Sequence, residues 1–304
     1  MRVRGTALVG LAVVATAAAA FLPATGTDGS SAAPRPAQAP QPAQAVPAPV
    51  RTTVFDGYGA WVDRYDYATG RQIVTPATID VMARAGVQVL FLQGATPAGG
   101  TLLAPKRQRA LIARAKRHGM RVVAWYLPTT KPISADLRRL RAMNRLKGVD
   151  AIGLDAESRA VGRVSTRTAR LLSLIKQTNA LTDKPIGLIT PSPTAMARWS
   201  TTFWPGYPFA AAAPYVDAYL PMTYWAWHRK QTTARGQITG DVNRLRAIPE
   251  VAGKPIHVIG MTTWKSDART FAALSRELEL AGGSLYDWLT TPQALRKPLR
   301  GLRR

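Results

Sequence analysis

Two acidic residues, Asp155 and Glu157, close an apolar run near the middle of this 304-residue chain. Side chains two positions apart on a β-strand project to the same side, so both carboxylates are expected to emerge together. A carboxyl group beside a second carboxylate keeps its proton at a higher pH than usual. Glu157 is therefore expected to donate a proton to a leaving oxygen, with Asp155 raising its pKa and positioning the substrate.

Eight β-rich runs alternate with amphipathic stretches that are rich in Arg. The expected strands are Val54–Val62, Val87–Gln93, Arg121–Leu127, Val149–Asp155, Pro185–Thr190, Val216–Met222, Pro255–Met261 and Ser284–Trp288. Apolar strands separated by helices are typical of a parallel sheet that helices cover. Eight such repeats predict an α/β fold, a single (β/α)8 TIM barrel, and no Gly-x-Gly-x-x-Gly follows the first strand to indicate a dinucleotide site.

Function in such a barrel is expected where the strands end, because the loops that carry chemistry gather there. Aromatic rings stack on sugar rings, and carboxylates and amides bind hydroxyls, so side chains of these kinds predict a carbohydrate ligand. The expected substrate-binding residues at strand ends are Trp61, Asp63, Gln93, Tyr126, Tyr224, Trp225, Tyr286 and Trp288. Asp287 is the first candidate for a nucleophile or base, since the eighth strand lies across the barrel from the fourth, and Asp63 is the second.

The first fifty residues differ in composition from the rest of the chain. Arg2 and Arg4 followed by the apolar run Ala7 to Leu22 predict a signal peptide, or an anchor if the run is not cleaved. A protein that is secreted or held at the cell envelope is thus expected, and because the chain has no Cys it must fold without disulfides. The expected divisions are a signal peptide or anchor at 1–29, a disordered Pro/Ala/Gln-rich linker at 30–50, the barrel at 51–295 and a basic tail at 296–304.

The formal net charge is +24, carried mainly by Arg residues scattered over the expected helices. No nucleic-acid-binding motif accompanies them, so specific nucleic-acid binding is not expected, and attraction to anionic envelope polymers is the better interpretation. The three His residues are far apart and lack acidic residues at metal-ligand spacing. We therefore expect no metal and no other cofactor. We also expect the protein to be a monomer.

The segment from Val149 to Glu157 resembles a motif of chitinase-like glycosidases of family 18, Asp-x-x-Asp-x-Asp-x-Glu. Asp150, Asp155 and Glu157 fall on three of its acidic positions, whereas Gly153 replaces the middle Asp and Ala156 a bulky residue. This resemblance implies a barrel fold and hydrolysis of glycosidic bonds. It places Glu157 as the acid and Trp288 as the ring beneath the sugar.

The segment Leu220-Pro221-Met222-Thr223-Tyr224 is similar to the Met-x-Tyr segment of the same enzymes, in which the Tyr assists the acetamido group of the substrate. Here Trp225 replaces the Asp that often follows that Tyr. A second resemblance is to the family 25 lysozymes, which carry Asp-x-Glu on a central strand and further acids on the first and last strands. Asp63 and Asp287 would occupy those further positions.

The sequence favours a glycoside hydrolase that cleaves an envelope or extracellular polysaccharide by carboxylic acid catalysis. The alternative is a non-catalytic glycan-binding TIM barrel of the cell envelope, which would keep the aromatic side chains and bind sugar unchanged. A third interpretation is an envelope scaffold, in which Asp155 and Glu157 pair with Arg159 or Arg163. Only the site can separate these functions, since a barrel fold hosts all three.

Overall fold

The computed structural model describes residues 53–69, 73–198, 203–228, 230 and 232–302. The expected signal peptide or anchor at 1–29 and the expected linker at 30–50 lie outside these residues. No helix within the described ranges combines the length and the apolar character needed to cross a bilayer.

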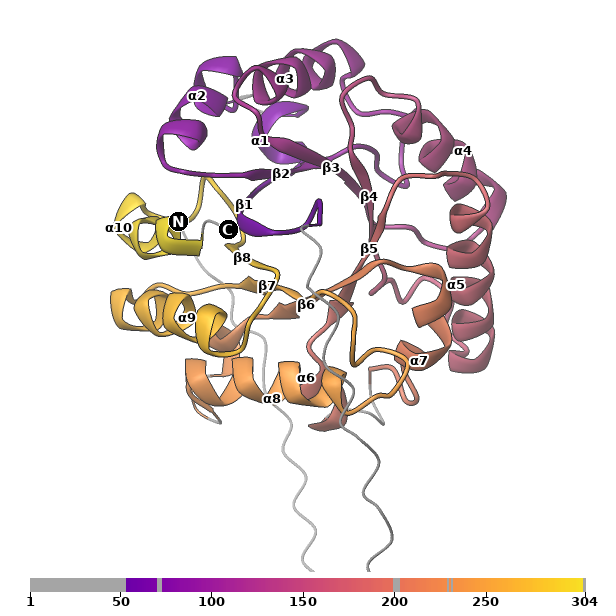
Figure 1. Ribbon diagram of the computed structural model, residues 1–304. Helices are drawn as coiled ribbons and strands as arrows, with labels where there is room; N and C mark the ends of the chain where they lie inside the picture. Colours follow the sequence, from indigo (N-terminus) through magenta and orange to yellow (C-terminus); the bar gives the residue numbers. More distant parts are fainter. Residues whose placement is uncertain (1–52, 70–72, 199–202, 229, 231, 303–304) are drawn as a thin grey trace, which may run out of the picture. The chain divides into compact units, whose positions relative to one another are not determined.

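Eight parallel strands form a closed barrel in chain order, and the eighth pairs with the first (Figure 1). The strands are β1 Gly57–Val62, β2 Val89–Gln93, β3 Arg121–Tyr126, β4 Ala151–Asp155, β5 Ile186–Pro191, β6 Ala218–Thr223, β7 His257–Gly260 and β8 Gly282–Leu285. The predicted TIM barrel is confirmed. The last strand begins two residues earlier than expected and ends at Leu285, so Tyr286, Asp287 and Trp288 belong to the loop that follows it.

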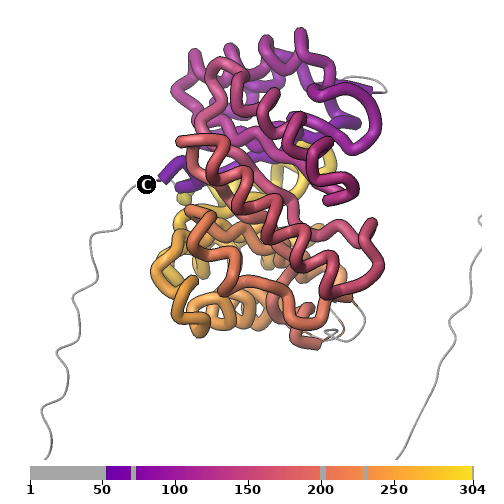
Figure 2. The backbone as a smooth tube through the Cα atoms, turned by 90° about the vertical axis from the view of Figure 1, so that its right-hand side faces the viewer, coloured from indigo at the N-terminus to yellow at the C-terminus, as the bar shows by residue number. Residues whose placement is uncertain are grey.

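Helices surround the barrel, as Figure 1 shows in a view into it and Figure 2 shows from the side of α4 and α5. The α-helices are α1 Arg64–Tyr67, α2 Pro76–Arg84, α3 Pro105–Arg117, α4 Ile133–Asn144, α5 Val164–Asn179, α6 Pro193–Arg198, α7 Phe209–Ala212, α8 Ala234–Arg246, α9 Lys265–Glu277 and α10 Gln293–Arg296. The 3-10 helices are η1 Ala213–Tyr215, η2 Trp225–His228 and η3 Lys297–Leu302. Gly86, Gly119 and Gly148 follow α2, α3 and α4 with positive φ angles, a backbone conformation that glycine adopts without strain.

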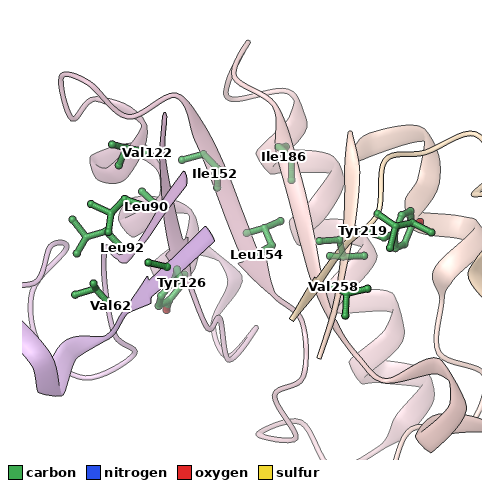
Figure 3. Close-up of a cluster of buried hydrophobic side chains, with 14 of the residues drawn as sticks. Val62, Leu90, Leu92, Val122, Tyr126, Ile152, Leu154, Ile186, Tyr219 and Val258 are labelled. Carbon is green, nitrogen blue, oxygen red and sulfur yellow. The ribbon is translucent and has the colours of Figure 1, made fainter. Parts of the chain in front are cut away.

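Alternate residues of β1 to β7 belong to two separate hydrophobic clusters. On β3, Val122 and Ala124 pack in the cluster between the sheet and the helices, whereas Val123 and Trp125 pack inside the barrel. Figure 3 shows members of the outer cluster, among them Val62 of β1, Leu154 of β4 and Val258 of β7. This period of two decides which residues at a strand end can reach the barrel mouth.

The C-terminal residues that we expected to form a separate basic tail continue the barrel domain. Residues 297–302 form η3, which packs against α9 and β1 and buries Leu299 and Leu302. The basic residues of this segment alternate with these apolar anchors, so the positive charge is held on a folded surface. Within the described residues, the fold of the barrel domain therefore continues through residue 302.

The junction of β8 with β1 leaves no room for a side chain at Gly282. A Cβ atom there would lie 2.3 Å from Nδ1 of His257 and 2.5 Å from the carbonyl oxygen of Gly57. We expect Gly282→Ala to lower the free energy of unfolding by about 1–3 kcal/mol, the usual cost of over-packing, in urea titrations followed by circular dichroism.

Gly253→Ala is the matched control, because a Cβ atom at Gly253 meets nothing within 4 Å. Both substitutions restrict the unfolded chain equally, so the control is expected to change the free energy by less than about 1 kcal/mol. Equal stability of the two variants would contradict the close packing of β8 on β1.

Candidate active site

A cavity of about 420 Å³ lies at the carboxyl ends of the barrel strands. It is lined by Trp61, Trp125, Asp155, Glu157, Ile189, Pro191, Ser192, Ala195, Met196, Phe203, Met222, Tyr224, Trp227, His228, Ile259, Met261 and Tyr286. Of the expected site residues, the cavity thus brings together Asp155, Glu157, Trp61, Tyr224 and Tyr286. Two carboxylates among aromatic rings form a site that can donate a proton to a bound sugar.

Asp155 is the last residue of β4. Its side chain points into the barrel, because Ala151 packs inside the barrel and residues an even number of positions apart on a strand face the same side. Its side chain is 7% exposed, and its Oδ1 atom is buried without a hydrogen-bond partner. Burial, and then the neighbouring charge of Glu157, raises the pKa of Asp155 well above its usual value. A buried carboxyl oxygen with no partner is a group that a ligand can satisfy.

Glu157 follows two residues later in a turn and is half-buried. Burial raises its pKa above the ordinary value for a glutamate. Within the described part of the chain, no Arg or Lys forms an ion pair with either Asp155 or Glu157, and the guanidinium of Arg159 lies over the ring of Phe203 instead. The two carboxyl groups therefore share a poorly solvated corner in which holding one proton is favourable.

The floor of the cavity is a stack of aromatic rings inside the barrel. Trp61 stacks on Phe91 with ring centroids 4.2 Å apart and an angle of 6° between the rings. Trp125 meets the edge of Trp61 at 5.7 Å, and Tyr286 lies 6.0 Å from it on another side. These rings fill the barrel below the cavity, so a ligand can enter only from the carboxyl ends of the strands.

A buried hydrogen-bond chain fixes the orientation of Trp61. Nδ1 of His257 lies 2.7 Å from the carbonyl oxygen of Phe55, which can only accept, so this nitrogen carries the hydrogen. Nε2 then accepts from the hydroxyl of Ser284 at 3.0 Å, and that hydroxyl oxygen accepts from Nε1 of Trp61 at 2.7 Å. Burial lowers the pKa of His257 to about 4, so the ring stays neutral and the chain stays intact at neutral pH.

The structure explains one departure from the chitinase motif. A Cβ atom on Gly153 would lie 2.9 Å from Cβ of Trp125 and 3.3 Å from Cδ1 of Ile189, so these neighbours leave no room for the missing Asp side chain. Nε1 of Trp125 is buried without a partner and belongs to a side chain that lines the cavity. Asp150, another acid of the motif, instead binds Nζ of Lys116 at 2.8 Å and the backbone N–H of Val122 at 2.7 Å.

Tyr224 directly follows β6 and lines the cavity with Tyr286 and Trp227. Burial, and then the charges of Asp155 and Glu157, raises the pKa of Tyr224 well above its usual value. Its phenol therefore keeps its proton and can donate a hydrogen bond to a ligand that also contacts the carboxyl groups. Trp227 packs edge-on against Tyr224 at 4.9 Å and is 66% exposed, so its ring forms the rim of the cavity.

Asp63 and Asp287, the expected nucleophile candidates, do not line the cavity. Oδ1 of Asp63 accepts from the backbone N–H of Tyr65 at 2.7 Å and so caps α1, and its Oδ2 accepts from the hydroxyl of Tyr286 at 3.1 Å. Oδ1 of Asp287 accepts from the backbone N–H of Thr290 at 2.9 Å. Both acids are thus engaged in local structure around the loops after β1 and β8.

Gln93 and Tyr126 do not line the cavity either. Oε1 of Gln93 accepts from the backbone N–H of Arg64 at 2.8 Å, which ties β2 to α1. Tyr126 occupies an outward position of β3, and its hydroxyl donates to Oδ1 of Asp136 on α4 at 2.6 Å. Tyr126 follows Trp125 on the strand, so only Trp125 of this pair can point inward.

Trp225 and Trp288 also pack outside the barrel interior. The ring of Trp225 is 1% exposed and packs against Phe271 of α9 with centroids 5.3 Å apart. Trp288 is 5% exposed and carries the guanidinium of Arg296 over its ring at 3.8 Å. Neither ring can lie beneath a sugar in the cavity.

Several lining residues that the expected substrate-binding set leaves out are apolar. Ile189 and Pro191 on β5, Met222 on β6, and Ile259 and Met261 at the end of β7 bring an apolar wall to the cavity. Ile189 and Leu220 point into the barrel, and on a strand the residue two positions later points the same way. Applied to these strands, this alternation would have identified Pro191 and Met222 as lining residues. In the described ranges, no cluster of three or more His, Asp or Glu side chains is arranged to hold a metal ion.

No protein-family model matches the sequence, and no curated protein matches it either. Solved structures do match the barrel. A chitinase from Chromobacterium violaceum ATCC 12472 superposes with a TM-score of 0.60 at 11% identity, covering 82% of this chain and 99% of that one. A family 18 chitinase from Cycas revoluta in complex with (GlcNAc)4 gives 0.60 at 10% identity, covering 80% and 98%.

The spore cortex-lytic enzyme SleL of Bacillus megaterium QM B1551 also gives a TM-score of 0.60 at 10% identity, covering 82% of this chain and 74% of that one. The chain shares its fold with family 18 chitinases. The resemblance stated from the sequence is therefore confirmed for the barrel, and the chemistry has to be argued from the cavity.

Asp66, beside this site, couples the stability of the barrel to pH. Burial, and then the charges of Asp63 and Asp287, raises the pKa of Asp66 to about 7, although a hydrogen bond from the backbone of Asp63 opposes the rise. The unfolded value is about 3.9, so the folded protein binds the extra proton between these pH values and loses stability as the pH rises through them.

We expect Asp66→Asn to gain stability relative to the parent protein between about pH 4 and 7, by at most about 1.4 kcal/mol per pH unit, and to gain no more above that range. Urea unfolding at a series of pH values measures the difference. Asp183→Asn, which removes a carboxylate at an exposed loop position, is the control and should change the free energy of unfolding by less than about 0.5 kcal/mol. A flat difference for Asp66→Asn would contradict the raised pKa.

Proposed function

We propose that the protein is a glycoside hydrolase in which Glu157 is the general acid. The observation that supports this most strongly is the pair of carboxyl groups, free of ion pairs to the described cations, in a cavity floored by Trp61. Their raised pKa values keep a proton available near neutral pH, as acid catalysis requires. The shared fold with family 18 chitinases supports the same reaction class.

We further propose that the substrate supplies its own nucleophile. Asp155 and Glu157 are the only carboxyl groups among the described lining residues, and Asp63 and Asp287 are engaged elsewhere. An N-acetyl group beside the scissile bond can take this role, because its carbonyl oxygen attacks the anomeric carbon as the bond to the leaving oxygen breaks. Glu157 gives its proton to that oxygen, and Tyr224 and Asp155 hold the acetamido group.

The second step returns the enzyme to its starting state. Water attacks the anomeric carbon, the acetamido carbonyl is released, and Glu157 takes up a proton from the water. Two displacements at one carbon restore its original configuration, so the product retains the anomeric configuration of the substrate. The proposed substrate is accordingly a polysaccharide that contains N-acetylated amino sugars, outside the cytoplasm if the N-terminal segment directs export.

We expect the protein to release reducing sugar from chitin oligosaccharides or peptidoglycan and to leave the fully deacetylated oligosaccharides intact. Glu157→Gln should lower the rate by about 10²–10⁴-fold, the usual contribution of a general acid, and should still bind the oligosaccharide. Rates are measured by reducing-sugar release, and proton NMR of the first product identifies its anomer.

Glu277→Gln is the matched control, since Glu277 is an exposed residue of α9 that forms an ion pair with the exposed Arg235. It should retain full activity, because exposed ion pairs contribute little to stability. Sugar binding without release by the parent protein would instead support the glycan-binding barrel. Cleavage with inversion, or equal cleavage of deacetylated oligosaccharides, would exclude the acetamido group as the nucleophile.

A further inference from the structure

A second cavity, of about 230 Å³, lies between the end of α2 and the segment α10–η3. It shares no lining residue with the candidate active site. Its lining residues are Val81, Arg84, Ala85, Trp288, Gln293, Arg296, Lys297 and Arg300. Four of these side chains are cationic and none is acidic, so the cavity concentrates positive charge.

These four cations lack the oxygen partners that some other basic side chains of the barrel have. Arg114 pairs with Asp80, for example, and Arg121 donates to the backbone carbonyl oxygen of Asp56. In the part of the chain that the structure describes, no carboxylate pairs with any cation of this cavity. Like charges around one small space repel one another, so their arrangement costs free energy unless an anion joins them.

Helix position alone does not explain the cluster. Arg84 and Arg296 lie in the last turns of α2 and α10, where the partial negative charge of a helix end favours a cation. Lys297 and Arg300 belong to η3, and both are exposed beside the cavity. The chain folds η3 back so that these two charges meet the other two.

Arg296 is the member of the cluster that most needs a ligand. Its guanidinium lies 3.8 Å above the ring of Trp288, which holds it in place, and its Nε atom is buried without a hydrogen-bond partner. Burial lowers the pKa of Arg296, which reflects the cost of keeping this charge away from water. An anion in the cavity would satisfy the free donor and offset that cost.

We propose that this cavity binds the phosphate groups of a linear polyanion. The fork of N–H donors on a guanidinium matches two oxygens of a phosphate, and three of the four cations are Arg. One phosphate carries a charge of at most about −2, so four cations require more than one group. Successive phosphates along a chain can occupy the cavity and continue past Lys297 and Arg300 at its rim.

This site does not depend on the proposed hydrolase. Polyanion binding is expected to be unchanged in Glu157→Gln, because that residue belongs to the other cavity. Loss of sugar cleavage and loss of polyanion binding are therefore separate results. With both sites on one barrel, the polyanion site would hold the protein on a charged polymer while the active site cleaves a glycan.

The test is isothermal titration of the full-length protein with linear polyphosphate over a range of salt concentrations. In Lys297→Gln/Arg300→Gln we expect at least about a tenfold loss of affinity, and the slope of log K against log salt concentration should fall by about 2, one for each lost cation. Both residues are exposed, so unchanged thermal unfolding should accompany this loss.

Arg138→Gln/Lys176→Gln is the matched control, because these exposed residues of α4 and α5 lie across the barrel from α10 (Figure 1). It removes the same charge and should leave the slope unchanged. Equal losses in both double variants, or no binding to polyphosphate, would overturn the proposal. Inorganic phosphate that binds as tightly as the polymer would overturn the polymeric ligand, as would tighter binding to phosphatidylglycerol vesicles.

Discussion

The stack of Trp61 on Phe91 is the contact on which the candidate site depends. It fills the barrel to a defined level and supplies the floor on which a ligand would lie. The stack cannot tilt, because Nε1 of Trp61 is bound to Ser284 and, through it, to a neutral His257. The polar atoms beneath the rings are thus paired, whereas Oδ1 of Asp155 and Nε1 of Trp125, two buried atoms of lining residues, have no partner.

The barrel could be predicted from the sequence because each of its eight repeats carries the same signals. Apolar runs such as Val89–Gln93 are short and rich in β-branched or aromatic residues, and glycines such as Gly86 end the helices between them. The last strand was placed too late because Gly282 and Gly283 look like a turn in the sequence. The structure uses them as strand residues where His257 and Phe271 come too close for a side chain.

The site could be predicted only in part, because a strand end shows which residues are near the mouth but not which way they face. Asp155 and Glu157 carried their own signal, two acids at the end of an apolar run. Tyr126 was chosen in place of its neighbour Trp125, a shift of one residue that reverses the direction of a side chain. Which loop residues, such as Asp287, turn inward depends on tertiary packing, which no local pattern encodes.

The barrel closes by the pairing of β1 with β8, and η3 packs against both strands. This closure determines how much of the chain must be synthesised before the domain can fold. β1 has its second neighbour only when residues 282–285 are available, and Leu299 and Leu302 close the outer core still later. A chain emerging from the ribosome therefore has almost its whole length exposed before the barrel can close. Until β8 pairs with both β7 and β1, those two strands keep an open edge to which the strand of another chain can add, so a partly synthesised barrel is prone to associate with its neighbours.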